Sequence, residues 1–459
     1  MTDRPNILLL MSDEHRADIT GYEGNPIIRT PFLDHLARTG VRFTNAYCPA
    51  PVCVPGRQCL MSGQHCFTNG VKSFWDDLPP GHMTFARALA REGYRTVCCG
   101  KLHHHGADQM QGWTHRPVGD LAVAPRYIES RNRSTFEQME RQAGTGKWSM
   151  EKEIKRAGIG TGPYQTADEL ATLGALRVIQ EHFNSSMYDR PMSHQPLLLK
   201  VSLVQPHYPY FTDETKFNYY LNRVPIFIEP RAGATLTPKH AGVAVNVDPR
   251  EIRRATAAYY GMIETVDAQF RRVCDALEQV GQNLDDWIII YTSDHGEMLG
   301  EHGLWEKSCF YEAAVRVPLL IRCPSRFSPR VCSENVNLVD LFATICELSG
   351  SPIPPSLDSR SLLPLLHGDA GAWDNYTLSL DAGTRLMIKH DHLKYQHNGG
   401  EYPEILFDLE TDPSERVNRM GDPRYQDAVQ RFRAQRAALP GFTELSRTVA
   451  GAAPAGSSS

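Results

Sequence analysis

The amino-acid sequence predicts an α/β protein built on one large, mixed, mostly parallel sheet sandwiched by helices. Continuous apolar runs of strand length lie at 6–11, 196–204 and 286–292, and such runs are typical of strands buried on both faces. Segments with helical spacing of apolar residues separate them, most clearly at 252–280. Strands that alternate with long helices favour a parallel sheet covered on both sides. The 459 residues suffice for one large domain and an appendage.

Shorter elements follow the same alternation along the first 200 residues. Thr30 and Pro31 open a predicted helix, because proline suits the first helical turn. The other expected elements are strands at 41–46 and 94–99 and helices at 57–62, 83–91 and 167–183. Residues 208–248 carry aromatic residues and prolines without a clear period, so we expect a long surface loop there that shapes a pocket.

The pattern changes after about residue 364. Short runs of alternating hydrophobicity at 376–380, 386–389, 392–396 and 404–409 precede a helical segment at 425–438. They predict a small antiparallel sheet with a closing helix, which together make an α+β subdomain. We therefore expect a main α/β domain over residues 1–365, a C-terminal α+β subdomain over 366–445 and a flexible tail over 446–459.

Composition and charge exclude several classes of protein. The 48 Lys and Arg residues against 53 Asp and Glu residues give a net charge of −5, so we expect neither nucleic acid nor a membrane surface as a partner. No apolar run has the length of a membrane span. Met1–Asp13 has a short apolar run without a small-residue cleavage site, which indicates a buried strand and not a signal peptide. We therefore expect a cytoplasmic protein.

Polar residues follow abruptly on four of the predicted strands, namely at 13–15, 100–105, 205–207 and 293–297. In open α/β sheets, ligands bind beyond the carboxyl ends of the strands, so these groups are expected to line one cleft. Asp13, Asp294 and His295 offer two carboxylates and an imidazole, which is a ligand set for a divalent metal. Gly296 lets the chain turn directly after that pair.

The cysteines are interpreted in two ways. An odd count of 11 in a chain without a secretory signal argues against a disulfide framework, so ten are interpreted as buried thiols that fill apolar space. Cys53 is the exception, because a proline and Arg57 follow it near a helix start, where negative charge is stabilised. Two interpretations of Cys53 stay open: a reactive cysteine for an anionic substrate, or a small buried residue in a tight turn.

The segment Cys53-Val54-Pro55-Gly56-Arg57 resembles the Cys-x-Pro-x-Arg signature of the type I sulfatases, in the alkaline phosphatase superfamily. The similarity continues through 61–64 and recurs in order at 5–13, 30–37, 100–103, 206–209, 291–307 and 406–413. It covers nearly the whole chain. The resemblance implies an alkaline phosphatase-like fold, with residues 1–365 as the catalytic domain, and a sulfatase that hydrolyses a small-molecule or carbohydrate sulfate ester.

The resemblance also implies a cofactor set and residue roles. A maturation enzyme would oxidise Cys53 to formylglycine, whose hydrate supplies the nucleophile. The metal, usually Ca²⁺, would be held by Asp13, the modified Cys53, Asp294 and His295. Arg57 would hold the hydrate, and Lys101 and Lys307 would bind sulfate oxygens. His103 would take the hydroxyl proton that lets the hemiacetal expel sulfate and regenerate the aldehyde, and His207 would protonate, or hydrogen-bond, the leaving alkoxide. Because His295 stands where many members have asparagine, Mn²⁺ or another divalent metal is an alternative.

Some residues depart from the commonest pattern. Ser12 precedes Asp13 where many members carry two acids in tandem, and a single acid with a histidine looks more like the choline sulfatase and phosphonate monoester hydrolase branch. Residues 120–129 hold no tryptophan for a trimethylammonium group, which counts against choline. His104 and His105 are expected at the pocket rim or in a solvated turn. A homo-oligomer, as in relatives of this branch, stays open.

Two alternatives to the sulfatase hypothesis remain. Hydrolysis of phosphonate monoesters or phosphodiesters would use the same nucleophile and metal. A non-catalytic sulfatase-like protein would only bind a metal and an anion. The complete set of Lys101, His103, His207 and Lys307 argues against the second alternative.

Overall fold

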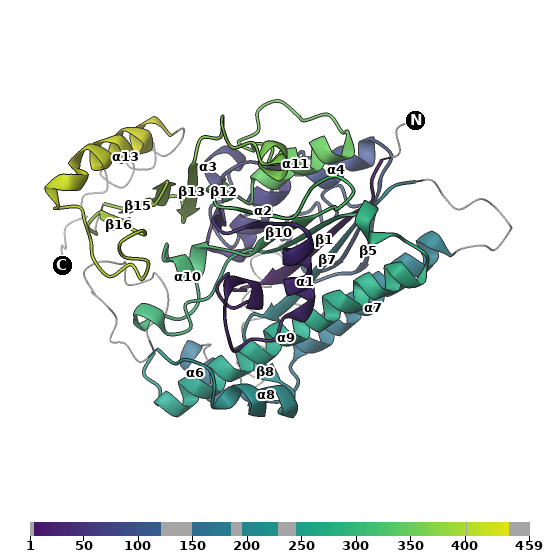
Figure 1. Ribbon diagram of the computed structural model, residues 1–459, viewed down its shortest axis with the longest axis horizontal. Helices are drawn as coiled ribbons and strands as arrows, with labels where there is room; N and C mark the ends of the chain where they lie inside the picture. Colours follow the sequence, from purple (N-terminus) through teal and green to yellow (C-terminus); the bar gives the residue numbers. More distant parts are fainter. Residues whose placement is uncertain (1–3, 121–148, 185–194, 228–244, 401, 440–459) are drawn as a thin grey trace, which may run out of the picture.

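The computed structural model describes residues 4–120, 149–184, 195–227, 245–400 and 402–439. Its main sheet has eight strands in the order β11-β2-β10-β9-β1-β7-β4-β5 (Figure 1). The strands are β1 (Ile7–Asp13), β2 (Val41–Phe43), β4 (Arg95–Gly100), β5 (His115–Val118), β7 (Leu197–Pro206), β9 (Ile288–Ser293), β10 (Leu319–Arg322) and β11 (Arg330–Cys332). All neighbouring pairs are parallel except those of β10, which runs antiparallel to β9 and β2. The predicted mixed, mostly parallel sheet is confirmed.

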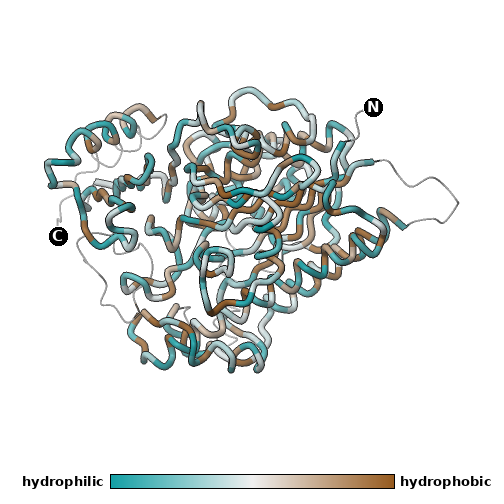
Figure 2. Tube along the Cα trace, viewed as in Figure 1, coloured by the Kyte–Doolittle hydropathy of each residue, from teal (hydrophilic) through white to brown (hydrophobic). Residues whose placement is uncertain are grey.

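Three central strands, β1, β7 and β9, are buried along their whole length. Alternate residues of β1 belong to different cores, with Leu9 on one face of the sheet and Leu8 on the other. Figure 2 shows hydrophobic chain segments concentrated around this sheet. The apolar runs of the sequence therefore mark strands that are covered on both faces, as predicted.

Helices form the two outer layers. One face packs against α1 (Pro31–Thr39), α7 (Pro163–Phe183) and α9 (Pro249–Gln279). The other face packs against α2 (Cys53–Ser62), α4 (Phe85–Arg91), α11 (Asp340–Ser349) and α12 (Leu363–His367). In Figure 1 the long helices α7 and α9 lie side by side below the sheet, and α2, α4 and α11 lie above it. Among the described residues, no helix combines the length and apolar character needed to cross a membrane.

The C-terminal part forms a separate antiparallel sheet at one end of the molecule (Figure 1). Its strands are β13 (Tyr376–Asp381), β14 (Arg385–His390), β15 (Leu393–Asn398) and β16 (Ile405–Asp408). Helix α13 (Gln426–Ala438) packs Val429 and Phe432 against this sheet. The α+β character is confirmed, whereas the boundaries at 365 and 445 stay predictions and the tail at 446–459 lies outside the described residues.

Several local predictions were wrong. The expected long loop at 208–248 contains β8 (Phe211–Thr212) and α8 (Glu214–Leu221), because Asp213 caps the helix and Phe217 packs in the core beside α9; residues 228–244 lie outside the description. The expected strand at 41–46 is two strands, β2 and β3 (Ala46–Tyr47), and the helix expected at 57–62 begins at Cys53. The remaining short elements are α3 (Cys66–Asn69), α6 (Met150–Arg156), β6 (Gly158–Ile159), α10 (Glu312–Val315) and β12 (Val336–Asn337), with 3-10 turns at Gly21–Glu23, Leu284–Asp286, Glu301–Gly303 and Pro423–Tyr425.

Candidate active site

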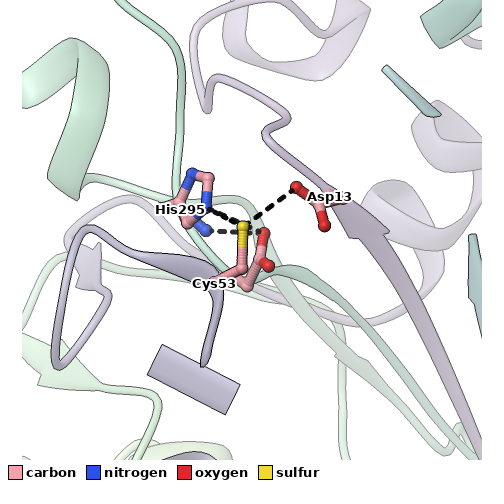
Figure 3. Close-up of side chains that lie close together, drawn as sticks. Asp13, Cys53 and His295 are labelled. Atoms are coloured by element: carbon pink, nitrogen blue, oxygen red, sulfur yellow. Dashed lines mark hydrogen bonds and ion pairs between the residues drawn. The ribbon is translucent and has the colours of Figure 1, made fainter. Parts of the chain in front are cut away.

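The carboxyl ends of β1 and β9 bring four potential metal ligands together. Asp13 ends β1, Asp294 and His295 follow β9, and Cys53 is the first residue of α2. One ligand atom from each of the four lies within 4.8 Å of the others, and all four side chains are buried. The Cys53 Sγ atom lies 3.1 Å from His295 Nε2 and 3.8 Å from Asp13 Oδ1 (Figure 3). The sequence-predicted metal set is thus one spatial cluster.

The donor chemistry of this cluster fits a divalent cation. His295 Nδ1 lies 3.0 Å from the Gly296 carbonyl oxygen, so Nδ1 carries the proton and Nε2 presents its lone pair to Cys53 and the carboxylates. A hydrogen bond of this kind is what fixes a metal-binding imidazole. Gly296 is required at the turn, because a Cβ at this position would collide with the carbonyl oxygen of Ala313.

Arg57 connects the strand ends. Its Nε donates to Asp294 Oδ2 at 2.7 Å, and one terminal nitrogen donates to Asp13 Oδ2 at 3.2 Å. The other terminal nitrogen donates to the Lys101 carbonyl oxygen and to Ser202 Oγ, each at 2.9 Å. Burial by itself raises the pKa of Asp13, but Lys101, His207 and Arg57 lower that pKa well below its usual value. The Asp13 carboxylate is therefore ionised and available to a metal.

Two lysines border the cluster. The Lys101 ammonium pairs with Asp13, and the Lys307 ammonium donates to Glu14 Oε1 at 2.7 Å. Lys307 also lies over the Tyr208 ring, 5.6 Å from its centroid. Burial lowers the pKa of each lysine, but the neighbouring negative groups outweigh burial and raise both pKa values above the usual one. Both side chains are therefore cations that can face an anionic substrate.

Two imidazoles follow the neighbouring strands β7 and β4, next to the charged cluster. His103 follows β4, and His207 follows β7, with its Nδ1 atom 2.6 Å from the Tyr208 carbonyl oxygen. Burial lowers the pKa of each imidazole well below the usual value, so both rings are neutral near pH 7. The structure thus brings all six residues predicted as catalytic close to the metal set, while their roles stay predictions.

Sequence reasoning missed two acids of the site. Asp120 accepts the backbone N–H groups of Leu102 at 2.7 Å and His103 at 3.1 Å, and this holds His103 at a φ of 61°. Glu14 was noted only as part of the polar run after the first strand, although it is buried and contacts Lys307. A second acid beside Asp13 was the available signal for Glu14.

The expectation for His104 and His105 was wrong as to solvation. Both side chains are buried, at 0% and 1% exposure. Gln58 Nε2 donates one hydrogen bond to His104 Nδ1 at 2.8 Å and another to Asp77 Oδ1 at 2.7 Å. This polar contact ties the loop after β4 to helix α2, so His104 supports the loop that carries His103.

Comparisons with known proteins identify a family and related chains. The Sulfatase family profile matches residues 5–351, and a profile described as N-sulphoglucosamine sulphohydrolase, C-terminal, matches residues 300–439. An arylsulfatase of Clostridium perfringens is 28% identical over 94% of this chain and 93% of its own length. A choline-sulfatase of Rhizobium meliloti is 29% identical over 95% of this chain and 87% of its own length.

Solved structures show the same fold. The phosphonate monoester hydrolase of Agrobacterium radiobacter superposes with a TM-score of 0.76 and 24% identity, over 97% of this chain and 96% of that one. Because the family profile spans most of the chain and the signature cysteine lies in the predicted metal cluster, this chain belongs to the sulfatase family and is a sulfuric ester hydrolase.

Proposed function

We propose that this enzyme releases inorganic sulfate from the ester of a small-molecule or saccharide alcohol, using formylglycine at position 53 and a divalent metal. The convergence of Asp13, Cys53, Asp294 and His295 within 4.8 Å carries this proposal. The names of the arylsulfatase and choline-sulfatase relatives support it. Sulfate is a tetrahedral anion, and cationic side chains surround the four converging residues.

The thiol of Cys53 itself is a poor nucleophile. Burial and the charge of Asp13 raise its pKa to about 12, so the thiol stays protonated at neutral pH. Oxidation to formylglycine would replace it with a hydrated aldehyde that supplies an oxygen nucleophile. Because position 53 is only 2% exposed, the maturation enzyme that we propose as a partner would act before the chain has folded.

The metal would be held by Asp13, Asp294, His295 and residue 53. Calcium suits the two carboxylates, and the imidazole suits manganese as an alternative. When bound, the metal would polarise a sulfate oxygen and the nucleophile. Arg57 fixes both carboxylates in place, since its guanidinium donates to each of them.

The remaining side chains bind the anion and move protons. Lys101 and Lys307 would bind the sulfate oxygens, on which negative charge grows in the transition state. The neutral imidazole of His103 would accept the hydroxyl proton whose loss lets sulfate leave residue 53 and regenerates the aldehyde. His207 Nδ1 donates to the Tyr208 carbonyl oxygen. Once it is also protonated on Nε2, His207 would give that proton to the leaving alkoxide or donate a hydrogen bond to it.

Maturation and sulfate release together test the proposal. The chain is produced with a formylglycine-generating enzyme, and mass spectrometry of the tryptic peptide 43–57 is expected to show the aldehyde. Sulfate release is then measured with p-nitrophenyl sulfate, choline sulfate and a panel of sulfated sugars. Full activity in protein that retains the Cys53 thiol would overturn the mechanism.

Hydrolysis of phosphonate monoesters or phosphodiesters is the second candidate function. The single acid Asp13 together with His295 supports it, because this combination resembles the choline sulfatase and phosphonate monoester hydrolase branch. The same enzyme preparation is assayed with p-nitrophenyl phenylphosphonate. A kcat/KM that exceeds the value for every sulfate ester by orders of magnitude would reassign the reaction.

We also propose the remaining expectations from the sequence. The net charge of −5 supports a protein without a nucleic-acid or membrane partner, and we also propose a cytoplasmic location. A homo-oligomer stays a proposal that size-exclusion chromatography with light scattering tests directly.

A further inference from the structure

Aromatic residues connect the surface with His103. The Phe74 ring makes an edge-to-face contact with the His103 ring, with centroids 5.1 Å apart and planes at 86°. Trp75 packs against Phe74 with centroids 5.1 Å apart and lies 6.1 Å from the ring of His105. Trp75 is 36% exposed, although it is one of the largest apolar side chains of the protein. An indole in this position is accessible to a molecule that approaches His103.

A second aromatic group adjoins the other imidazole. Tyr164, the second residue of α7, makes an edge-to-face contact with the His207 ring, with centroids 5.8 Å apart and planes at 81°. Burial raises the pKa of Tyr164, and Lys101, Asp13 and Lys307 also influence this pKa. The Tyr164 hydroxyl therefore lies near the same charged cluster that would bind the sulfate group.

The predicted catalytic residues would bind the sulfate group of a sulfate ester but not its alcohol. Arg57, Lys101 and Lys307 are charged and suit the sulfate group, whereas none of them suits the body of an alcohol. The alcohol has to extend away from this cluster, past the imidazoles that lie beside it. The rings of Phe74 and Tyr164 contact these imidazoles, and aromatic rings bind flat rings by stacking.

We propose that Phe74, Trp75 and Tyr164 form a leaving-group subsite that selects sulfate esters whose alcohol carries a ring, either an aryl group or a pyranose. This inference rests on the proposed sulfatase function and adds the class of alcohol. Trp75 provides the accessible stacking face, Phe74 supports it against His103, and Tyr164 borders the subsite beside His207.

Substitution of Trp75 tests the subsite. Trp75→Ala is expected to raise the KM for phenyl sulfate, for glucosamine 6-sulfate or for both about tenfold, because one stacking contact is lost. Its kcat is expected to stay within about twofold, and Trp75→Phe is expected to restore most of the affinity. The inhibition constant of inorganic sulfate is expected to stay constant, since sulfate lacks an alcohol. The ester with the larger change identifies the ring.

Control variants separate stacking from folding. Tyr164→Ala is expected to raise the KM in the same direction, and Tyr164→Phe to raise it less. Trp373→Ala is the matched control, because Trp373 stacks on Arg360 next to the C-terminal sheet, and its KM is expected to equal that of the wild type. Unchanged KM values for both ring esters in Trp75→Ala, or a parallel rise in the sulfate inhibition constant, would refute the subsite.

A binding measurement distinguishes failure of the subsite from failure of the proposed function. Phenyl sulfate and glucosamine 6-sulfate are titrated into unmatured protein that retains Cys53, and the intrinsic tryptophan fluorescence is recorded. At least one ligand is expected to change the fluorescence of the wild type but not of Trp75→Phe. If matured enzyme releases no sulfate while this change persists, the proposed function fails and the subsite stands. If sulfate is released but the change is absent, the subsite fails alone.

Discussion

Two clusters of buried charge can be compared within this protein. The catalytic cluster lies at the carboxyl ends of β1 and β9 and contains Asp13, Cys53, Arg57, Lys101, Asp294 and His295. The C-terminal charge cluster lies between α10 and the antiparallel sheet and contains Glu312, Lys394 and Glu415 together with Tyr47 and Arg316. In both clusters, burial removes charged groups from water, which is energetically unfavourable.

The two acids of the C-terminal charge cluster share one cation, Lys394. Lys394 Nζ, which is fully buried, lies 2.8 Å from Glu312 Oε1 and 2.6 Å from Glu415 Oε1. The second oxygen of Glu312 accepts from the Tyr47 hydroxyl at 3.0 Å, and the second oxygen of Glu415 accepts from the Glu312 backbone N–H at 2.7 Å. Each acid therefore has its partners within the protein, as a structural ion pair requires.

In the catalytic cluster the ligand atoms point at one another. Asp13 Oδ1, Cys53 Sγ and His295 Nε2 converge. The carboxylate oxygen and the imidazole nitrogen both present lone pairs, which repel each other. Such a set suits a divalent cation, and the signature residue Cys53 lies within it. The difference teaches that buried charge by itself does not identify a functional site, whereas convergence of ligand atoms does.

Asp294→Asn breaks the catalytic cluster and has the largest expected effect. It removes one ligand charge and leaves the Arg57 guanidinium with one carboxylate fewer, so kcat for p-nitrophenyl sulfate is expected to fall by about 10³-fold or more. Bound metal, measured by plasma mass spectrometry, is expected to fall with it. A variant that keeps a tenth of the wild-type kcat and its full metal content would contradict the assignment of Asp294.

Lys394→Met breaks the C-terminal charge cluster and is expected to give the opposite pattern. Glu312 and Glu415 lose their shared partner inside the protein, so the free energy of unfolding in urea is expected to drop by about 3–5 kcal/mol. The kcat of the folded fraction is expected to remain that of the wild type. The double variant Lys394→Met/Glu415→Gln, with one uncompensated charge removed, is expected to recover part of the loss. A fall in kcat at unchanged stability would assign this cluster to the active site.

The fold was predictable wherever burial on both faces leaves a continuous apolar run. Strands β1, β7 and β9 and helix α9 show this pattern, and all four were predicted within a few residues. Strand β10 was missed because it has only four residues and pairs antiparallel with its neighbours. Helix α8 was missed because its packing partner α9 lies far away in sequence. Tertiary contacts, which no local pattern reports, decide both elements.

The site was predictable for residues that follow a strand or carry the signature motif. Asp13, Cys53 and Asp294 are of this kind, and the structure brings them together. Asp120 could not be predicted, because its contacts are with backbone N–H groups of Leu102 and His103. Such contacts depend on the path of the chain and leave no mark in residue type or spacing.

Asp120→Ala sharpens the comparison within the catalytic cluster, since it is expected to change the position of His103 while all four predicted metal ligands stay in place. Without the carboxylate, the backbone at His103 is expected to leave its left-handed conformation, and kcat is expected to fall about 10- to 100-fold with little change in KM. Steady-state kinetics measures both constants, and Asp120→Asn is expected to retain more activity. Asp108→Ala serves as the control, because Asp108 lies in the loop between β4 and β5 that also contains His103, and it pairs with Arg87. An Asp120→Ala defect confined to KM would count against positioning of His103.

Asp267→Asn extends the comparison to a buried acid that is paired with backbone N–H groups, and it has the smallest expected effect. Its carboxyl group accepts from Leu33 at 2.8 Å and Phe32 at 3.1 Å, and burial raises its pKa from 3.8 to about 7. The folded protein therefore holds a proton that the unfolded chain releases above about pH 4, so this group's contribution to stability falls as the pH rises from about 4 to about 7. In Asp267→Asn, the free energy of unfolding in urea is expected to fall between pH 5 and pH 8 by about 1 kcal/mol less than in the wild type. The kcat is expected to stay unchanged. Parallel curves for variant and wild type would mean that Asp267 is ionised throughout, and that two backbone donors suffice to keep a buried carboxylate charged without a cation.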